Sequence, residues 1–423
     1  MRIAIRNGRL IDPAHQVDAT TDLFVVDGRI AGIGQPPEGF QADRGIDARD
    51  RIVCPGLIDL CARLREPGQE HKATIASETA AAAGGGVTTL VCPPDTDPVI
   101  DEPAVVELIR RRAKAAGQAR VLTLGALTHR LRGERLAEMA ALQEAGCVGV
   151  GDGGRPVAST RVLRRALEYA ATFGLTVFLT PLDPALGHGV AHEGQVATRM
   201  GLAGIPAAAE TGVIARDLEL IRDLGVRVHF GRLSCARSVE LVARAQAEGL
   251  PVTADVAVHQ LHLTEIDLAG FDSRCHVLPP LRGLRDRDAL RTGLASGVVG
   301  ALCSDHQPHE PDAKQAPFGD TEPGISGLDT LLALSLRLAW DDSLPLSALV
   351  ERLTWGPARV LGLESGHLGV GAPADVCVFD PEADWRVESD RLRGRGQNSP
   401  FIGWELRGRV THTLLEGRVV YEA

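Results

Sequence analysis

The chain has 423 residues, with 45 Lys and Arg side chains against 55 Asp and Glu side chains, so its formal net charge is −10. The 44% of hydrophobic and 24% of charged residues can build a large core, which excludes wholesale disorder. The acidic balance argues against nucleic acid as the main partner, because duplex binding requires a basic surface.

The first residues, Met1–Ile5, are typical of a strand and not of a signal peptide. No apolar run reaches the roughly 18 residues that a membrane span needs. We therefore expect a cytoplasmic protein that does not associate with membranes.

Both ends of the chain are β-rich. Near the start, the apolar segment Leu23–Val26 runs into an Asp-Gly turn, a hairpin signal. Near the end, Ala374–Phe379 and Arg409–Leu415 have the same character. We expect the two ends to pair as one small β-sandwich domain, built from residues 1–51 and 363–423.

Short β-branched segments alternate with helix-length amphipathic segments through residues 52–362. This alternation predicts βαβ units. The predicted strands are Ile52–Leu60, Val87–Cys92, Arg120–Leu127, Cys147–Gly151, Leu175–Thr180, Val226–Leu233, Pro251–Val256 and Val298–Ser304. Eight such units predict an α/β fold of the (β/α)8 TIM-type barrel class, in which functional residues stand at the carboxyl ends of the strands.

The eight cysteines lie in apolar, strand-like segments and form no C-x-x-C pair. This spacing indicates buried thiols, and it argues against a disulfide framework or a zinc ribbon.

Several motifs are specific enough to indicate a family. They are Pro55–Gly68, Gly84–Thr89, Pro93–Pro98, Gly201–Pro206, Ser304–His309, Gly324–Asp329 and Asn398–Phe401. Together they resemble a dihydroorotase of the cyclic amidohydrolase group over nearly the whole chain. The resemblance implies reversible closure of carbamoyl-aspartate to dihydroorotate at a zinc centre, with an aspartate after strand eight moving the proton. Such a centre lowers the pKa of bound water toward about 7.

Most of the family's metal-ligand positions are changed in this chain. The six positions, read from the resemblance, are Cys61, Arg63, Asp152, Thr180, Arg232 and Asp305. Four of them carry histidine in the family, and here they carry a thiol, a hydroxyl and two guanidiniums. A guanidinium cannot ligate zinc, and a neutral hydroxyl is a poor ligand. We therefore expect no cofactor and regard this set as a degenerate former metal site.

Charge suggests what replaces the metal ions. Arg63 and Arg232 supply two positive charges against the two negative charges of Asp152 and Asp305. Buried carboxylates without a counter-charge are costly. We expect guanidinium–carboxylate pairs at the barrel mouth, with Asp305 as a vestigial catalytic residue.

The substrate-binding positions that the resemblance implies are half retained. Arg65 and His309 match the residues that hold the substrate, here vestigial, whereas Asp95 and Leu278 stand where the family has asparagine. The charge of Asp95 would repel a dianionic substrate. For the nearby His259 we expect loop packing.

Three functions are compatible with this pattern. The first is a dihydroorotase-like pseudoenzyme of pyrimidine biosynthesis. Some bacterial chains of the family that lack the zinc-binding histidines resemble this one and associate with aspartate carbamoyltransferase, whose active oligomer they hold together. The resemblance implies that partner, and a homodimer within a larger hetero-oligomer.

The second hypothesis is an active metal-dependent cyclic amidohydrolase, either a dihydroorotase or a hydantoinase- or allantoinase-like enzyme. Its altered metal site would use Cys61, Asp152 and Asp305, with a loop histidine such as His188 or His259. The third hypothesis is a sensor that holds a small carboxylate through Arg65 and His309, the two retained substrate positions.

Overall fold

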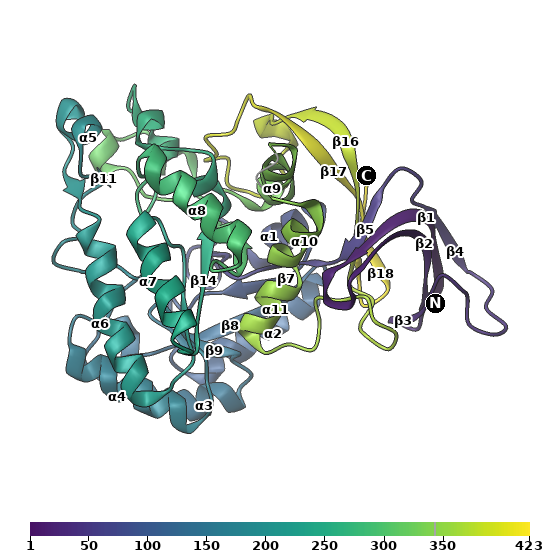
Figure 1. The fold of residues 1–423 in the computed structure, drawn as a ribbon, viewed down its shortest axis with the longest axis horizontal. Coiled ribbons are helices and arrows are strands. Elements are labelled where there is room, and N and C mark those ends of the chain that lie inside the picture. Colours follow the sequence, from purple (N-terminus) through teal and green to yellow (C-terminus); the bar gives the residue numbers. More distant parts are fainter. Residues whose placement is uncertain (342–343) are drawn as a thin grey trace.

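The computed structural model describes residues 1–341 and 344–423. Figure 1 shows two parts side by side: parallel strands surrounded by helices, and a curved sheet that carries both ends of the chain. The first part holds the candidate site.

Eight parallel strands form the barrel. They are β6 (Leu57–Asp59), β7 (Val87–Cys92), β8 (Arg120–Ala126), β9 (Gly149–Gly151), β10 (Val177–Leu179), β13 (Val228–Phe230), β14 (Val252–Ala257) and β15 (Ala301–Cys303). Each is hydrogen-bonded to the next in this order. A parallel bridge between Ala62 and His306 brings the segments after β6 and β15 together, so the barrel is nearly closed. The predicted (β/α)8 class is confirmed.

The first predicted strand, Ile52–Leu60, is in fact two strands in two different sheets. β5 (Ile52–Pro55) pairs with strands of the terminal sheet, and only β6 belongs to the barrel. The chain changes sheet at Gly56, where a Cβ atom would lie 2.2 Å from Thr88 Oγ1. A pattern of apolar residues shows burial but not the sheet to which a strand belongs, so the two strands appeared as one.

Helices surround the barrel. They are α1 (Ile75–Gly84), α2 (Pro103–Ala116), α3 (Met139–Glu144), α4 (Thr160–Thr172), α5 (Gln195–Met200), α6 (Ala208–Leu224), α7 (Ala236–Ala247), α8 (Leu284–Ser296), α9 (Leu331–Trp340), α10 (Leu346–Leu353) and α11 (Trp355–Leu361). α1 begins with a capping box, in which Thr74 accepts a hydrogen bond from the Ser77 backbone. Between β10 and α6, the short strands β11 (Ala191–His192) and β12 (Gly204–Ile205) pair in parallel.

The two ends of the chain form one hydrogen-bonded sheet. Its strands are β1 (Arg2–Asp12), β2 (Val17–Val26), β3 (Arg29–Ile33), β4 (Arg44–Asp47), β5, β16 (Val376–Arg386), β17 (Glu405–Leu415) and β18 (Arg418–Glu422). β5 joins the two ends, because it pairs with β1 on one side and with β16 on the other. The sheet is therefore continuous with the entry into the barrel.

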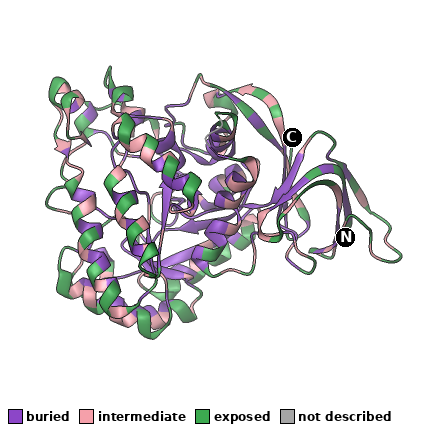
Figure 2. Cartoon of the chain, in the orientation of Figure 1, coloured by how far each residue is buried: buried purple, intermediate pink, exposed green. Residues whose placement is uncertain are grey.

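Burial follows this architecture. In Figure 2 the barrel strands are buried, and the surrounding helices expose their outer faces. All eight cysteines are buried and free, as the spacing predicted. Among the helices described, none is long and apolar enough to cross a membrane.

Candidate functional site at the barrel mouth

The six positions at which the resemblance implies metal ligands lie together where the barrel strands end. Five of them line a cavity of about 40 Å³. These are Cys61, Arg63, Asp152, Thr180 and Arg232. The sixth, Asp305, accepts a hydrogen bond from the Cys61 thiol, with 3.5 Å between Sγ and Oδ1. Sequence positions 244 residues apart thus meet at one point, because parallel strands present their carboxyl ends at the same face.

Asp305 is the centre of the cluster. Its Oδ1 atom accepts hydrogen bonds from Arg63 Nη1 at 3.2 Å, Arg232 Nη1 at 3.1 Å and Gln307 Nε2 at 3.2 Å. Burial by itself would raise the pKa of Asp305, but the guanidiniums of Arg232 and Arg63 outweigh burial and lower that pKa. Asp305 is therefore held as a carboxylate.

Arg63 bridges two carboxylates. Its Nε atom donates to Asp95 Oδ2 at 2.6 Å, and its Nη1 atom donates to Asp305. Burial disfavours the charged guanidinium, yet the nearby Asp95 and Asp305 carboxylates raise the pKa of Arg63 overall. The charge of Asp95, expected to repel a dianionic substrate, is thus partnered by Arg63.

Arg232 is held at three points. Its Nη1 atom contacts Asp305, its Nη2 atom donates to Thr180 Oγ1 at 2.6 Å, and its backbone N–H donates to Asp255 Oδ1 at 2.6 Å. Its backbone has a φ of 60°, a left-handed conformation that non-glycine residues rarely adopt. These contacts fix the guanidinium against Asp305.

Asp152 does not pair with an arginine, so one part of the expected charge pairing is wrong. Its carboxylate accepts backbone N–H groups from Gly154 at 2.9 Å and Thr180 at 2.8 Å. Burial raises its pKa despite these bonds. The second carboxylate of the arginine cluster is Asp95, because the chain after β7 brings it within reach of Arg63 Nε.

The surroundings of the Cys61 thiol disfavour its ionisation. Burial raises its pKa far above the ordinary value, against the opposing effect of Arg232. A thiol must ionise to react, so this environment favours an inert side chain.

The two retained substrate positions contact each other beside this cluster. Arg65 Nη2 lies 3.1 Å from His309 Nε2, and Lys72 Nζ lies 3.3 Å from His309 Nδ1. Burial, with the positive charge of Arg65, lowers the pKa of His309 to about 2, so the imidazole is neutral. Burial also lowers the pKa of Arg65 to about 10. Lys72, which the sequence reasoning did not single out, is part of this group.

A buried pair behind β15 was also missed. His306 Nε2 lies 2.7 Å from Glu78 Oε2 on α1, and Gly327 N–H donates to His306 Nδ1. Both side chains of the pair are fully buried. They anchor the loop that carries Asp305, and no local motif connects two residues that lie 228 positions apart.

His259 packs in the interior of the loop, as expected. It lies in a short 3-10 helix, Val258–Leu261, that follows β14. Within the described part of the chain, neither ring nitrogen has a hydrogen-bond partner, and burial lowers its pKa to about 4. His192, in β11, contacts Arg282 through Nδ1 at 3.0 Å.

Comparisons with known proteins agree with this architecture. Residues 50–238 match the family described as dihydro-orotase-like, and residues 250–421 match the amidohydrolase family. A dihydroorotase-like protein of Pseudomonas aeruginosa is 52% identical over the full length of both chains. A dihydroorotase of Geobacter sp. strain M21 is 44% identical, again over the full length of both. The L-hydantoinase of Arthrobacter aurescens superimposes with a TM-score of 0.89 at 25% identity, covering 99% of this chain and 96% of its own.

The expectation that no cofactor is used is contradicted by these matches. Amidohydrolases and hydantoinases of this kind typically use a binuclear metal site, so the comparisons imply a metal in this group of proteins. The side chains at the mouth do not fit such a centre as they are arranged, because two permanent cations point at Asp305. Over residues 1–341 and 344–423, no three His, Cys, Asp or Glu side chains are grouped so that they could hold a metal ion.

Fold, motifs and relatives thus agree on one lineage. Its members in the comparisons carry the names of hydrolases that act on cyclic amides, dihydroorotases and hydantoinases. The similarity extends over both the barrel and the terminal sheet. The chain belongs to the dihydroorotase-like family of amidohydrolases.

Proposed function

We propose that this protein is a dihydroorotase-like pseudoenzyme of pyrimidine biosynthesis, with a structural role in a cytoplasmic complex with aspartate carbamoyltransferase. One observation supports the loss of activity: the Asp305 carboxylate forms ion pairs with Arg63 and Arg232. The partner is inferred from the family resemblance and not from a contact in the structure.

The arginine cluster removes two properties that Asp305 would need for proton transfer. These are a pKa near the operating pH and an Oδ1 atom that is free to accept a proton. A general base works best when its pKa lies near the operating pH, whereas the two guanidiniums lower the pKa of Asp305. Its Oδ1 atom already accepts four hydrogen bonds, from Cys61, Arg63, Arg232 and Gln307. A carboxylate so paired is a structural ion-pair partner.

The rest of the framework is intact, which supports a role for the folded surface. The barrel is nearly closed, and relatives match over the whole length. We propose that the chain forms a homodimer and that this dimer joins the transferase in a larger hetero-oligomer.

Co-expression with the transferase of the same organism tests the assembly role. We expect the two chains to co-purify as one species in size-exclusion chromatography with light scattering, and the transferase activity per catalytic chain to rise on association. Separate elution with unchanged transferase activity would overturn the assembly proposal.

The second candidate is an active cyclic amidohydrolase, which the relatives named dihydroorotase favour. The assay is ring opening of dihydroorotate by the purified chain, with zinc supplied, and bound metal measured on the same sample. Turnover that disappears in Asp305→Ala would establish this candidate and overturn the pseudoenzyme. Absence of turnover in both the wild type and the variant supports the pseudoenzyme.

A further inference from the structure

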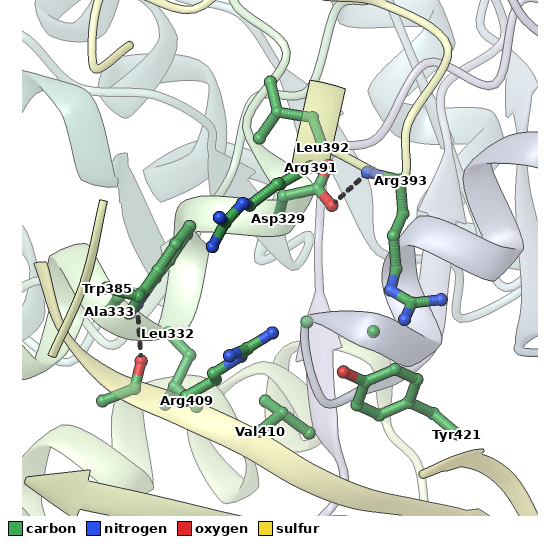
Figure 3. A pocket seen from close by; sticks show the side chains of 13 residues that line it. Asp329, Leu332, Ala333, Trp385, Arg391, Leu392, Arg393, Arg409, Val410 and Tyr421 are labelled. Carbon is green, nitrogen blue, oxygen red and sulfur yellow. Dashed lines mark hydrogen bonds between the residues drawn. The ribbon is translucent and has the colours of Figure 1, made fainter. Parts of the chain in front are cut away.

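A separate cavity of about 80 Å³ lies where the terminal sheet meets the barrel helices. It is bounded by the end of α1, the first residues of α9, and β16, β17 and β18. Figure 3 shows this cavity and the side chains around it. None of the barrel-mouth residues described above lines it.

Three arginines line the cavity. Figure 3 shows Arg391 and Arg393 on one side and Arg409 on the other. Arg391 pairs through Nε with Glu388 at 2.6 Å, which leaves its terminal nitrogens available. Among the described residues, neither Arg393 nor Arg409 forms an ion pair with a carboxylate. Arg393 and Arg409 thus bring to the cavity positive charge that no ion pair among the described residues neutralises.

One carboxylate does line the cavity, but it is engaged elsewhere. Asp329 accepts backbone N–H groups from Arg393 at 2.8 Å and Gly394 at 3.3 Å. Burial raises the pKa of Asp329, and these two hydrogen bonds oppose that shift. It holds the loop that presents Arg391 and Arg393, and it does not pair with their guanidiniums.

The remaining walls are flat and apolar. Trp385 is held in place because its Nε1 donates to the Gly408 carbonyl at 3.0 Å. Tyr421 lies under the Arg393 guanidinium, 4.5 Å from ring centroid to Cζ. Leu332 and Val410 complete the lining. Aromatic faces with adjacent guanidiniums suit a ring that carries a negative group, because the ring can stack while the charge is paired.

We infer that this cavity binds a small planar anion, a single aromatic or heteroaromatic ring bearing a phosphate or carboxylate group. The anionic group would pair with Arg409 and the free nitrogens of Arg391, and the ring would lie along Trp385. This site is distinct from the barrel mouth, and ligand binding there does not depend on the proposed function.

The probe is phenyl phosphate, titrated into the full-length protein by calorimetry and by saturation-transfer NMR. Benzoate tests whether a carboxylate replaces the phosphate. Inorganic phosphate and phenol separate the contributions of charge and ring. We expect phenyl phosphate or benzoate to bind more tightly than either half, and added salt to weaken the binding.

Two variants locate the site. Arg409→Gln should weaken phenyl phosphate binding by about tenfold or more, as expected for the loss of a charge-assisted hydrogen bond. Arg407→Gln is the matched control: Arg407 lies two residues away on β17, does not line the cavity, and pairs with Glu382 and Asp384. It should bind as the wild type does.

A third variant excludes the barrel mouth as the binding place. Arg65→Gln removes a buried cation beside His309 and should leave phenyl phosphate binding unchanged. Loss of binding in Arg65→Gln with retention in Arg409→Gln would overturn the inference. Inorganic phosphate binding as tightly as phenyl phosphate, or no binding of any ring anion to the wild type, would overturn it as well.

Discussion

Arg232 and Asp305 form an ion pair in the barrel mouth, with Nη1 3.1 Å from Oδ1 and side chains only 7% and 1% exposed. Arg63 contacts the same oxygen at 3.2 Å. Two cations therefore share one carboxylate oxygen at the position where the resemblance implies a metal centre. The cluster is therefore part of the folded core, and its contribution can be measured as a change in the free energy of unfolding.

Asp305→Asn should destabilise the protein by about 3 kcal/mol, because it leaves two buried guanidiniums short of a negative partner. Urea unfolding followed by circular dichroism measures the change. The matched control is Asp18→Asn, which removes the partner of Arg9 in an exposed pair and should cost at most about 1 kcal/mol. Equal losses in the two variants would contradict a stabilising role for the buried cluster.

Replacement by leucine should change the stability of the protein much more at His306 than at His259, although both histidines are buried. His306→Leu removes the partner of Glu78 Oε2 and of the Gly327 N–H, both buried, and should cost about 3 kcal/mol. His259→Leu removes two ring nitrogens that lack partners in the described chain, so the free energy of unfolding should change by less than about 1 kcal/mol. A large loss in His259→Leu would show that its ring makes a contact essential for the fold.

His309 should make the protein less stable as the pH falls below about 6.5, the ordinary histidine pKa. Its folded-state pKa is lowered to about 2, so below 6.5 the unfolded chain binds a proton that the folded chain does not. This adds a slope of up to about 1.4 kcal/mol per pH unit. The test compares the free energy of unfolding of the wild type with that of His309→Asn at about pH 5, 6 and 7. Identical slopes would show that His309 titrates alike in the folded and unfolded chains and would contradict the lowered pKa.

None of the eight cysteines should react with a thiol reagent in the native protein, because all are buried. Burial also raises the pKa of Cys61 well above its ordinary value. Ellman's reagent under native conditions should detect no thiol, and after denaturation it should detect all of them. Rapid native labelling at Cys61, mapped by mass spectrometry, would reopen a reactive role for that thiol.

The amino-acid sequence by itself determined the barrel, the pairing of the two ends and the set of residues at the mouth. Runs of β-branched residues report burial locally, and the carboxyl ends of parallel strands must meet at one face. The family resemblance that the motifs carry placed Cys61, Arg63, Thr180 and Arg232 together, and they line one cavity.

The tertiary structure alone decided which charges pair. Asp95, and not Asp152, is the second partner of Arg63, because ångström-scale placement of the loop after β7 determines which carboxylate reaches Nε. It also decided that the chain changes sheet at Gly56. Ion pairing depends on distances between residues far apart in the chain, and local sequence patterns do not contain those distances.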